Sequence, residues 1–215
     1  TLSANMTNNS TTAIQVASTA GFEDAGYLLI GDEVIQHTGK TSTTFTGITR
    51  GVKGSTNKAH TAGVYVSEAT SVAANGAAAM KLDTVIYADQ ITCTVPDSKV
   101  YFGKSGIYNI QFSAQILNYY TQDDNVTVWF KKNGNPIAYS SSIQQVSSIH
   151  ANGPGAIIIA LNYVDEFAAG DYFELFWSSV TGYPVLATAS PNTTSGAPAS
   201  PSLILTVQFV SGPTP

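Results

Sequence analysis

Charged side chains are scarce in this sequence of 215 residues. Asp, Glu, Lys and Arg make up 11% of it, against roughly 25% in an average globular protein. The formal net charge is −5, and Arg50 is the only arginine. Because no basic surface is available to neutralise phosphates, these features exclude a typical nucleic-acid-binding protein.

Cysteine and long hydrophobic runs are also nearly absent. Cys93 is the only cysteine, which excludes an internal disulfide and a cysteine-based zinc cluster and suits synthesis in a reducing cytosol. The longest strongly apolar run covers residues 156–161, far short of the ~20 residues that a membrane-spanning helix needs. We therefore expect no membrane partner.

The residues that are abundant favour β-structure. Thr, Ser, Gly and Asn replace the missing charges, and the sequence holds 11 Tyr but only 2 Met. Thr and Tyr are enriched in strands, whereas Met favours helices. We expect an all-β protein with a small N-terminal β module (1–70), an Ala- and Gly-rich linker (71–80) and a larger C-terminal β-sandwich (81–215).

Short strand-like segments separated by turn residues are typical of the N-terminal module. Gly31-Asp32 has the length and composition of a two-residue hairpin turn. The expected strands are 13–16, 27–30, 33–37, 43–50 and 64–68. The expected core consists of Ile14, Val16, Leu28, Ile30, Val34, Ile35, Phe45, Ile48, Val64 and Val66.

The C-terminal domain contains alternating apolar and polar residues, the pattern of half-buried antiparallel strands. Asn133-Gly134 is its strongest hairpin signal, and the Pro- and Gly-rich stretch 183–201 is interpreted as a long surface loop. A jelly roll of about eight strands follows as the expected architecture. The expected strands are 85–87, 91–95, 107–117, 126–131, 137–141, 156–163, 172–178 and 203–210.

Several short motifs of this domain occur in a known order. They are Ser-Gly-Ile-Tyr-Asn-Ile at 105–110, Val-Trp-Phe-Lys-Lys-Asn-Gly at 128–134, Leu161 with Gly-Asp-Tyr-Phe-Glu-Leu at 170–175, and the last strand at 202–209. Together they resemble the trimeric jelly roll shared by the globular head of complement's first component and the tumour necrosis factor family. The resemblance covers roughly 99–210 and implies a homotrimer.

The N-terminal module resembles a small β unit of bacteriophage virion proteins, particularly fibre-like and capsid-decorating ones. The segments that carry the resemblance are 14–19, 26–35, 44–51 and 59–64. It implies a structural protein on the surface of a phage particle, made in the cytoplasm of the bacterial host, by analogy and without site chemistry.

Few residues suggest catalysis. His37, His60 and His150 lie in no metal-binding or nucleophile motif, and His60 is interpreted as structural. Asp123, Asp124, Asp165, Glu166 and Asp171 offer carboxyl pairs for glycoside hydrolysis or, at Asp123-Asp124-Asn125, oxygen ligands for calcium. We favour turn residues instead, with 123–125 as a hairpin turn between 117 and 126. We expect no enzyme activity, cofactor or metal.

Aromatic residues are the candidate contact sites. Strands that are apolar on both registers must bury one face against something outside their own core. The expected trimer-interface residues are Tyr108, Phe112, Tyr172, Phe176 and Phe209. The expected outward contacts, or stacking platform for a host-surface glycan, are Tyr119, Tyr120, Trp129 and Tyr183, whereas Trp177 is assigned to the core.

Three functions fit these features. The first is a trimeric capsid decoration, or cement, protein that contacts the major capsid protein or another virion protein. The second is a short tail fibre or receptor-binding protein that recognises host-surface glycans, and the third is a carbohydrate-binding module. The absence of heptads and of a repeat array for a fibre shaft favours decoration.

Overall fold

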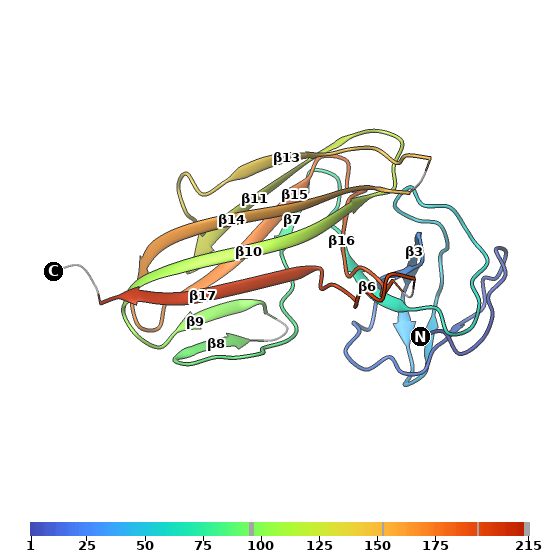
Figure 1. Ribbon diagram of the computed structural model, residues 1–215, viewed down its shortest axis with the longest axis horizontal. Helices are drawn as coiled ribbons and strands as arrows, with labels where there is room; N and C mark the ends of the chain where they lie inside the picture. Colours follow the sequence, from blue (N-terminus) through green and yellow to red (C-terminus); the bar gives the residue numbers. More distant parts are fainter. Residues whose placement is uncertain (95–96, 152, 193, 213–215) are drawn as a thin grey trace.

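The computed structural model describes residues 1–94, 97–151, 153–192 and 194–212. The chain is all-β, as expected, and consists of antiparallel sheets (Figure 1). No helix occurs in the described ranges. A small module and a longer sandwich lie end to end, and β17 runs from the junction towards the far end of the sandwich.

The N-terminal module is built from six short strands. The hairpin expected at Gly31-Asp32 joins β2 to β3, and Gly31 has a φ of 59° there, a conformation that glycine adopts without strain. Its strands are β1 (Ile14–Gln15), β2 (Gly26–Ile30), β3 (Glu33–His37), β4 (Gly39–Lys40), β5 (Thr44–Thr46) and β6 (Val66–Thr70). The buried core includes Leu2, Met6, Ile14, Val16, Leu28, Ile30, Ile35, Phe45 and Val66.

The sandwich consists of two sheets. In the front sheet, β10 pairs with β14 along one edge and with β17 and then β16 along the other. In the back sheet, β11 and β15 are central. The front strands are β10 (Gly106–Asn118), β14 (Gly155–Phe167), β16 (Val185–Ala187) and β17 (Leu203–Ser211). The back strands are β7 (Ala77–Ala79), β8 (Ile91–Thr94), β9 (Lys99–Phe102), β11 (Asp124–Lys132), β12 (Asn135–Pro136), β13 (Ser142–Val146) and β15 (Tyr172–Ser179).

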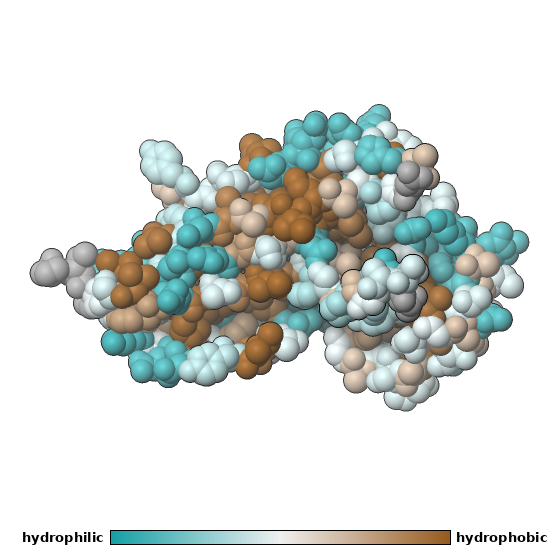
Figure 2. Space-filling model, viewed as in Figure 1, coloured by the Kyte–Doolittle hydropathy of each residue, from teal (hydrophilic) through white to brown (hydrophobic). Residues whose placement is uncertain are grey.

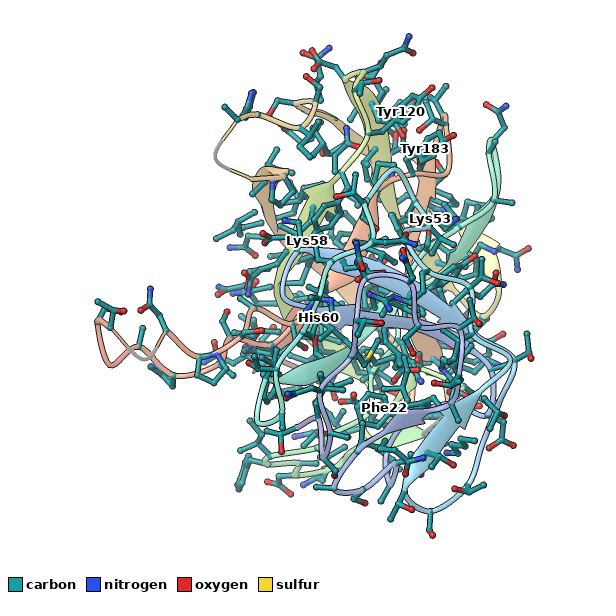
Figure 3. The ribbon with its side chains drawn as sticks, turned by 90° about the vertical axis from the view of Figure 1, so that its right-hand side faces the viewer. Phe22, Lys53, Lys58, His60, Tyr120 and Tyr183 are labelled. Carbon is teal, nitrogen blue, oxygen red and sulfur yellow. The ribbon has the colours of Figure 1, made fainter. Side chains whose placement is uncertain are left out.

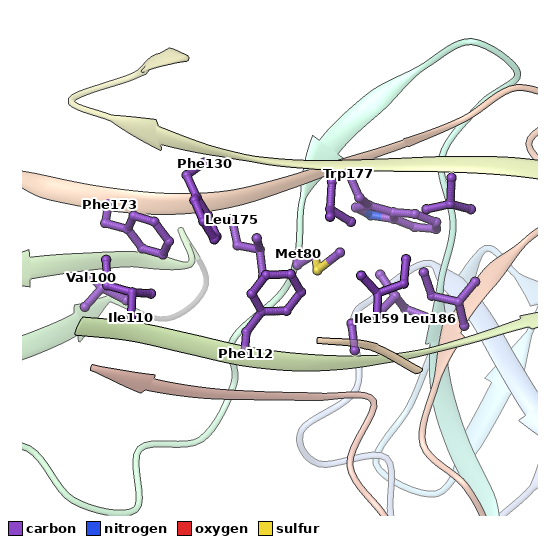
Figure 4. Packing of buried hydrophobic residues seen from close by; sticks show 14 of the residues in the cluster. Met80, Val100, Ile110, Phe112, Phe130, Ile159, Phe173, Leu175, Trp177 and Leu186 are labelled. Atoms are coloured by element: carbon purple, nitrogen blue, oxygen red, sulfur yellow. The ribbon is translucent and has the colours of Figure 1, made fainter. Parts of the chain in front are cut away.

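Inward-facing residues of the two sheets form one apolar core (Figure 4). Alternation along β10 and β15 places every second side chain inside, including Phe112 and Trp177, as a period of two requires. The core includes Met80, Val100, Phe102, Tyr108, Ile110, Phe112, Ile116, Val126, Val128, Phe130, Ile159, Phe167, Phe173, Leu175, Trp177 and Leu186. Trp177 is buried as predicted.

A shared sheet and a third buried cluster join the module to the sandwich. The short strand β16 pairs with β10 on one side and with β6 of the module on the other, so the front sheet continues into the module. At the same junction, Lys53 donates a hydrogen bond of 2.8 Å to the carbonyl oxygen of Gly182. The cluster consists of Leu29, Val34, Ala69, Tyr119, Val185 and Ala187.

The linker expected at 71–80 is part of the sandwich, which corrects that prediction. Val72 and Met80 are buried in the sandwich core, and β7 pairs with β15. The stretch 183–201 is likewise only partly a loop, since it begins with β16. Residues 189–192 and 194–200 then belong to an arm, closed by β-bridges, that projects from the body (Figure 3).

Three expected strands differ from those observed. Residues 85–87 form no strand and are highly exposed, and 137–141 form a turn that precedes β13. The strand expected at 43–50 is limited to β5, because the chain turns at Gly47, where φ is 63°. The strand expected at 91–95 is observed as β8; Val95 lies outside the described residues.

Candidate interaction surfaces

A buried ion cluster holds the N-terminal module together. Glu33, the first residue of β3, is fully buried, and Arg50 reaches it with two hydrogen bonds of 2.6 Å, from Nε to Oε1 and from Nη2 to Oε2. The backbone N–H groups of Gly51 and Lys58 and the Nε2 of His60 also contact this carboxylate. All the acceptor positions of Glu33 are therefore occupied, and it has no capacity left for a substrate.

The cluster fixes the protonation state of Glu33. Burial alone would raise the pKa of this carboxyl group, but the hydrogen bonds from Arg50, His60 and Lys58 outweigh it and lower the pKa from 4.5 to about 2. A carboxylate only accepts hydrogen bonds, so the Nε2 of His60 donates to it. This contact agrees with the interpretation of His60 as structural.

Asp124 occupies a second saturated site, at the end of the sandwich next to the module. Its carboxylate accepts hydrogen bonds of 2.6 Å from the hydroxyls of Ser179 and Thr181 and further bonds from backbone N–H groups. Asp123 accepts a bond from the N–H of Ser148. These bonds leave no oxygen cage for calcium, and in the part of the chain that the structure describes no three His, Cys, Asp or Glu residues gather. The expected hairpin turn is instead a crossover, because β10 and β11 belong to different sheets.

The four predicted glycan-contact residues do not form one surface. Tyr119 is buried at the junction, and burial raises the pKa of its hydroxyl; the prediction that it points outward is wrong. Tyr120 and Tyr183 stack with their ring centroids 3.8 Å apart, beside Lys53 (Figure 3). Trp129 lies on the outer face of the back sheet and is partly exposed. The sequence indicates which of these residues alternate outward, but not that the junction covers Tyr119.

The five predicted trimer-interface residues are divided between the core and two separate surfaces. Tyr108 and Phe112 are 2% and 4% exposed and belong to the core of their own chain, so their assignment to an intersubunit contact is corrected. Tyr172 and Phe176 point outward from the back sheet. Phe209 is 38% exposed on β17 and packs edge-on against Tyr108.

The register of β10 that contains Tyr108 and Phe112 faces the core, and the opposite register faces outward. On the outer face of the front sheet, Ile158 and Ile204 lie near the module end and Val164 lies nearer the far end, all more than half exposed. Hydrophobic side chains gather over the region of β10 and β14 (Figure 2). Neutral polar side chains, including Gln111 and Asn162, pair between these apolar positions. The signal was present in the sequence, because β14 and β17 have branched apolar residues on their polar registers.

A groove of about 940 Å³ opens beside the free edge of β17. It is lined by residues 81–91 on one side and by 201–209 on the other. Val85, Ile86 and Tyr87 are exposed here, with Ile86 at 96%. In the described ranges, no helix is long and apolar enough to cross a membrane.

Comparisons with protein families and with curated sequences give no information on the role of these surfaces. A scan against models of protein families finds no match, and a search of curated protein sequences finds none either. Function must therefore be inferred from the surfaces themselves. The buried charged groups described above are structural. The exposed apolar and aromatic faces of the two sheets are the candidate binding surfaces.

Proposed function

We propose that the protein is a non-enzymatic structural protein of a bacteriophage virion, a homotrimer with a jelly-roll sandwich that decorates the capsid surface. One observation carries the proposal: the exposed apolar face of β14, β10 and β17, on which Glu166 lies at the far end from the module. The phage-like segments of the N-terminal module support the virion assignment by resemblance.

The composition of this face suits contact between copies of the same chain. Ile158, Val164 and Ile204 are 65%, 57% and 52% exposed, and the residues between them are neutral amides and hydroxyls. In a cyclic trimer identical side chains approach one another near the threefold axis, and like charges would repel there. A contact centred on Ile158 and Ile204, away from Glu166, avoids this repulsion, and its apolar area gains from burial.

Trimer formation is tested by light scattering of the full chain. We expect a mass three times the 22.5 kDa of one chain. Ile204→Lys should reduce the mass to that of a monomer, because it places an ammonium group in each contact. Ile143→Lys is the matched control, since Ile143 is 66% exposed on β13 of the back sheet. A monomeric parent protein, or equal effects of the two variants, would contradict the proposal.

Attachment to the particle is assigned to the N-terminal module. A fragment that begins at residue 81 is a poor test, because it lacks β7, Val72 and Met80 of the sandwich and uncovers Tyr119 at the junction. The test therefore uses the full-length protein, which is added back to particles from which it has been removed. With few charges to form ionic contacts, binding should persist at high ionic strength. Particles that carry the protein should release DNA at a higher temperature, since a ligand that binds only the assembled state stabilises it.

Three linked copies strengthen attachment even where each contact is weak, because the second and third bind at the high local concentration that the first creates. Quantitative loss of the protein in salt, or identical DNA-release temperatures with and without it, would argue against a cement role and favour a receptor-binding fibre.

A further inference from the structure

The outer face of the back sheet holds a carboxylate, that of Glu174, with which none of the described residues pairs. Glu174 lies in β15 on the side away from the core and is only 8% exposed. Among residues 1–94, 97–151, 153–192 and 194–212, none forms a hydrogen bond or ion pair with its side chain. Glu33 and Asp124, the other buried carboxylates described above, are both saturated with donors. The oxygens of Glu174 are not among the fully buried side-chain atoms that lack a partner, so they reach the surface and can accept hydrogen bonds from a ligand.

The two lysines nearest in register are held on aromatic rings. Lys131 lies directly across from Glu174 on β11, but its Nζ sits 3.5 Å from the ring centroid of Phe176. Lys99 of β9 places its Nζ 4.9 Å from the ring centroid of Tyr172. Two ammonium groups therefore flank the carboxylate without pairing with it, and their charge would repel a cationic ligand.

Four aromatic rings surround the same carboxylate. Trp129 and Phe176 are opposite one another, with ring centroids 5.7 Å apart, on one side of Glu174 along the strands. Tyr101 and Tyr172 form the equivalent pair on the other side, 5.4 Å apart. Phe176 and Tyr172 are four residues apart on β15, so the two pairs are separated by roughly 13 Å. We call this surface the aromatic face: Lys99, Tyr101, Trp129, Lys131, Tyr172, Glu174 and Phe176.

The donors and acceptors of the aromatic face match hydroxyl groups. A carboxylate accepts hydrogen bonds from two neighbouring hydroxyls, ammonium groups donate to hydroxyl oxygens, and a partly exposed indole offers an apolar surface and an N–H group. No described residue accepts a hydrogen bond from the indole of Trp129. A hydroxyl-rich ring with an apolar C–H face satisfies all three kinds of group at once.

We propose that the aromatic face binds a neutral oligosaccharide, with Glu174 accepting hydrogen bonds from sugar hydroxyls and Trp129 stacking on a sugar ring. The face lies on the opposite side of the sandwich from β10 and β14 (Figure 1). It is therefore independent of the proposed trimer contact, and either proposal can fail without the other. The face carries hydrogen-bond donors in Lys99 and Lys131 and an acceptor in Glu174, so the uncharged hydroxyls of a neutral sugar can pair with both kinds of group.

The experiment uses the full-length protein and neutral probes. An array of neutral and acidic glycans identifies ligands, with cellohexaose and N-acetylchitohexaose titrated in solution by tryptophan fluorescence. Trp129 should respond, whereas Trp177, only 1% exposed in the core, should not. Glu174→Gln should weaken binding at least tenfold without lowering the unfolding temperature, and Trp129→Ala should abolish binding.

Two control variants have matched chemistry elsewhere on the surface. Glu166→Gln changes an exposed glutamate on β14 of the other sheet, and Tyr87→Ala removes an aromatic ring that is 85% exposed. Both should bind as the parent protein does. The proposal is overturned if no neutral glycan binds, if only acidic glycans bind, or if Glu174→Gln and Trp129→Ala retain affinity. A marked loss of stability in Glu174→Gln would also overturn it, since that result means that the carboxylate is paired within the fold.

Discussion

Replacing Glu33 by glutamine should destabilise the N-terminal module far more than its small change in shape suggests. The substitution keeps the size of the side chain but removes the charge that compensates Arg50, whose side chain is 3% exposed. Three backbone carbonyls, of Thr7, Ser10 and Lys58, would still accept hydrogen bonds from the guanidinium. They cannot neutralise it, so an uncompensated charge would remain buried.

Two routes give a similar magnitude for this cost. Removing one partner of a buried ion pair costs about 3–5 kcal/mol. The pKa of Glu33 is lowered from 4.5 to about 2, and at 1.36 kcal/mol for each pKa unit the ionised form contributes about 3 kcal/mol to stability. Because the folded pKa is below the unfolded one, this contribution is complete above pH 4.5 and is lost as the pH falls towards 2.

Urea unfolding followed by circular dichroism measures the effect at pH 7 and at pH 2. Asp32→Asn is the control, because Asp32 adjoins Glu33 in the sequence but forms only an exposed ion pair of 3.2 Å with Lys58. Such pairs contribute roughly 0–1 kcal/mol. We expect a deficit of about 3 kcal/mol or more for Glu33→Gln at pH 7 that shrinks at pH 2. A deficit no larger than that of Asp32→Asn, or one unchanged at pH 2, would refute the reasoning.

Three further predictions concern other sites. Burial lowers the pKa of His37 below 6.5. As the pH falls through 6.5 the unfolded chain therefore takes up the proton first, and the stability of the folded state decreases. His37→Phe should reduce the change in unfolding temperature between pH 7 and pH 5. Trp177→Ala should cost roughly 3–5 kcal/mol in urea unfolding, since it empties a fully buried site. Gly54→Ala should lose roughly 1–3 kcal/mol more than Gly63→Ala, because both have positive φ but only the former would place a Cβ 2.9 Å from the Cα of Tyr120. Similar losses for the two glycine variants would show that crowding at the junction is unimportant.

Alternation allowed much of the sandwich to be predicted. A period of two identified β10, β11, β15 and β17 and assigned Trp177 to the core, because a half-buried strand must separate its residues by face. Asn133-Gly134 was identified as a turn for a similarly local reason: both residues have positive φ and connect β11 to β12. These features depend on neighbours in the sequence.

The features that were missed depend on residues far apart in the chain. Tyr119 was predicted to point outward, yet the distant Val34 and Val185 pack with it in a buried cluster. The cluster around Glu33 likewise joins three separate segments, and no spacing rule connects Glu33 to His60. Alternation places Tyr108 and Phe112 on the apolar register of β10, but it does not say whether that register packs within the chain or against another copy; it packs within the chain.

The short strand β16 also sets an order of events during synthesis. Its Leu186 and Ala187 pair with Thr70 and Ala69 of β6. One edge of β6 therefore stays unpaired until the ribosome has synthesised residues 186 and 187. At roughly 5–20 residues per second, that interval is on the order of ten seconds. During this time β16 does not yet cover Ala69 and the apolar residues beside it. An unpaired strand edge of this kind can pair with another nascent chain. The module thus depends on the last third of the whole chain to cover the edge of β6. Production at low temperature, or with a chaperone that shields strand edges, should raise the yield of folded protein.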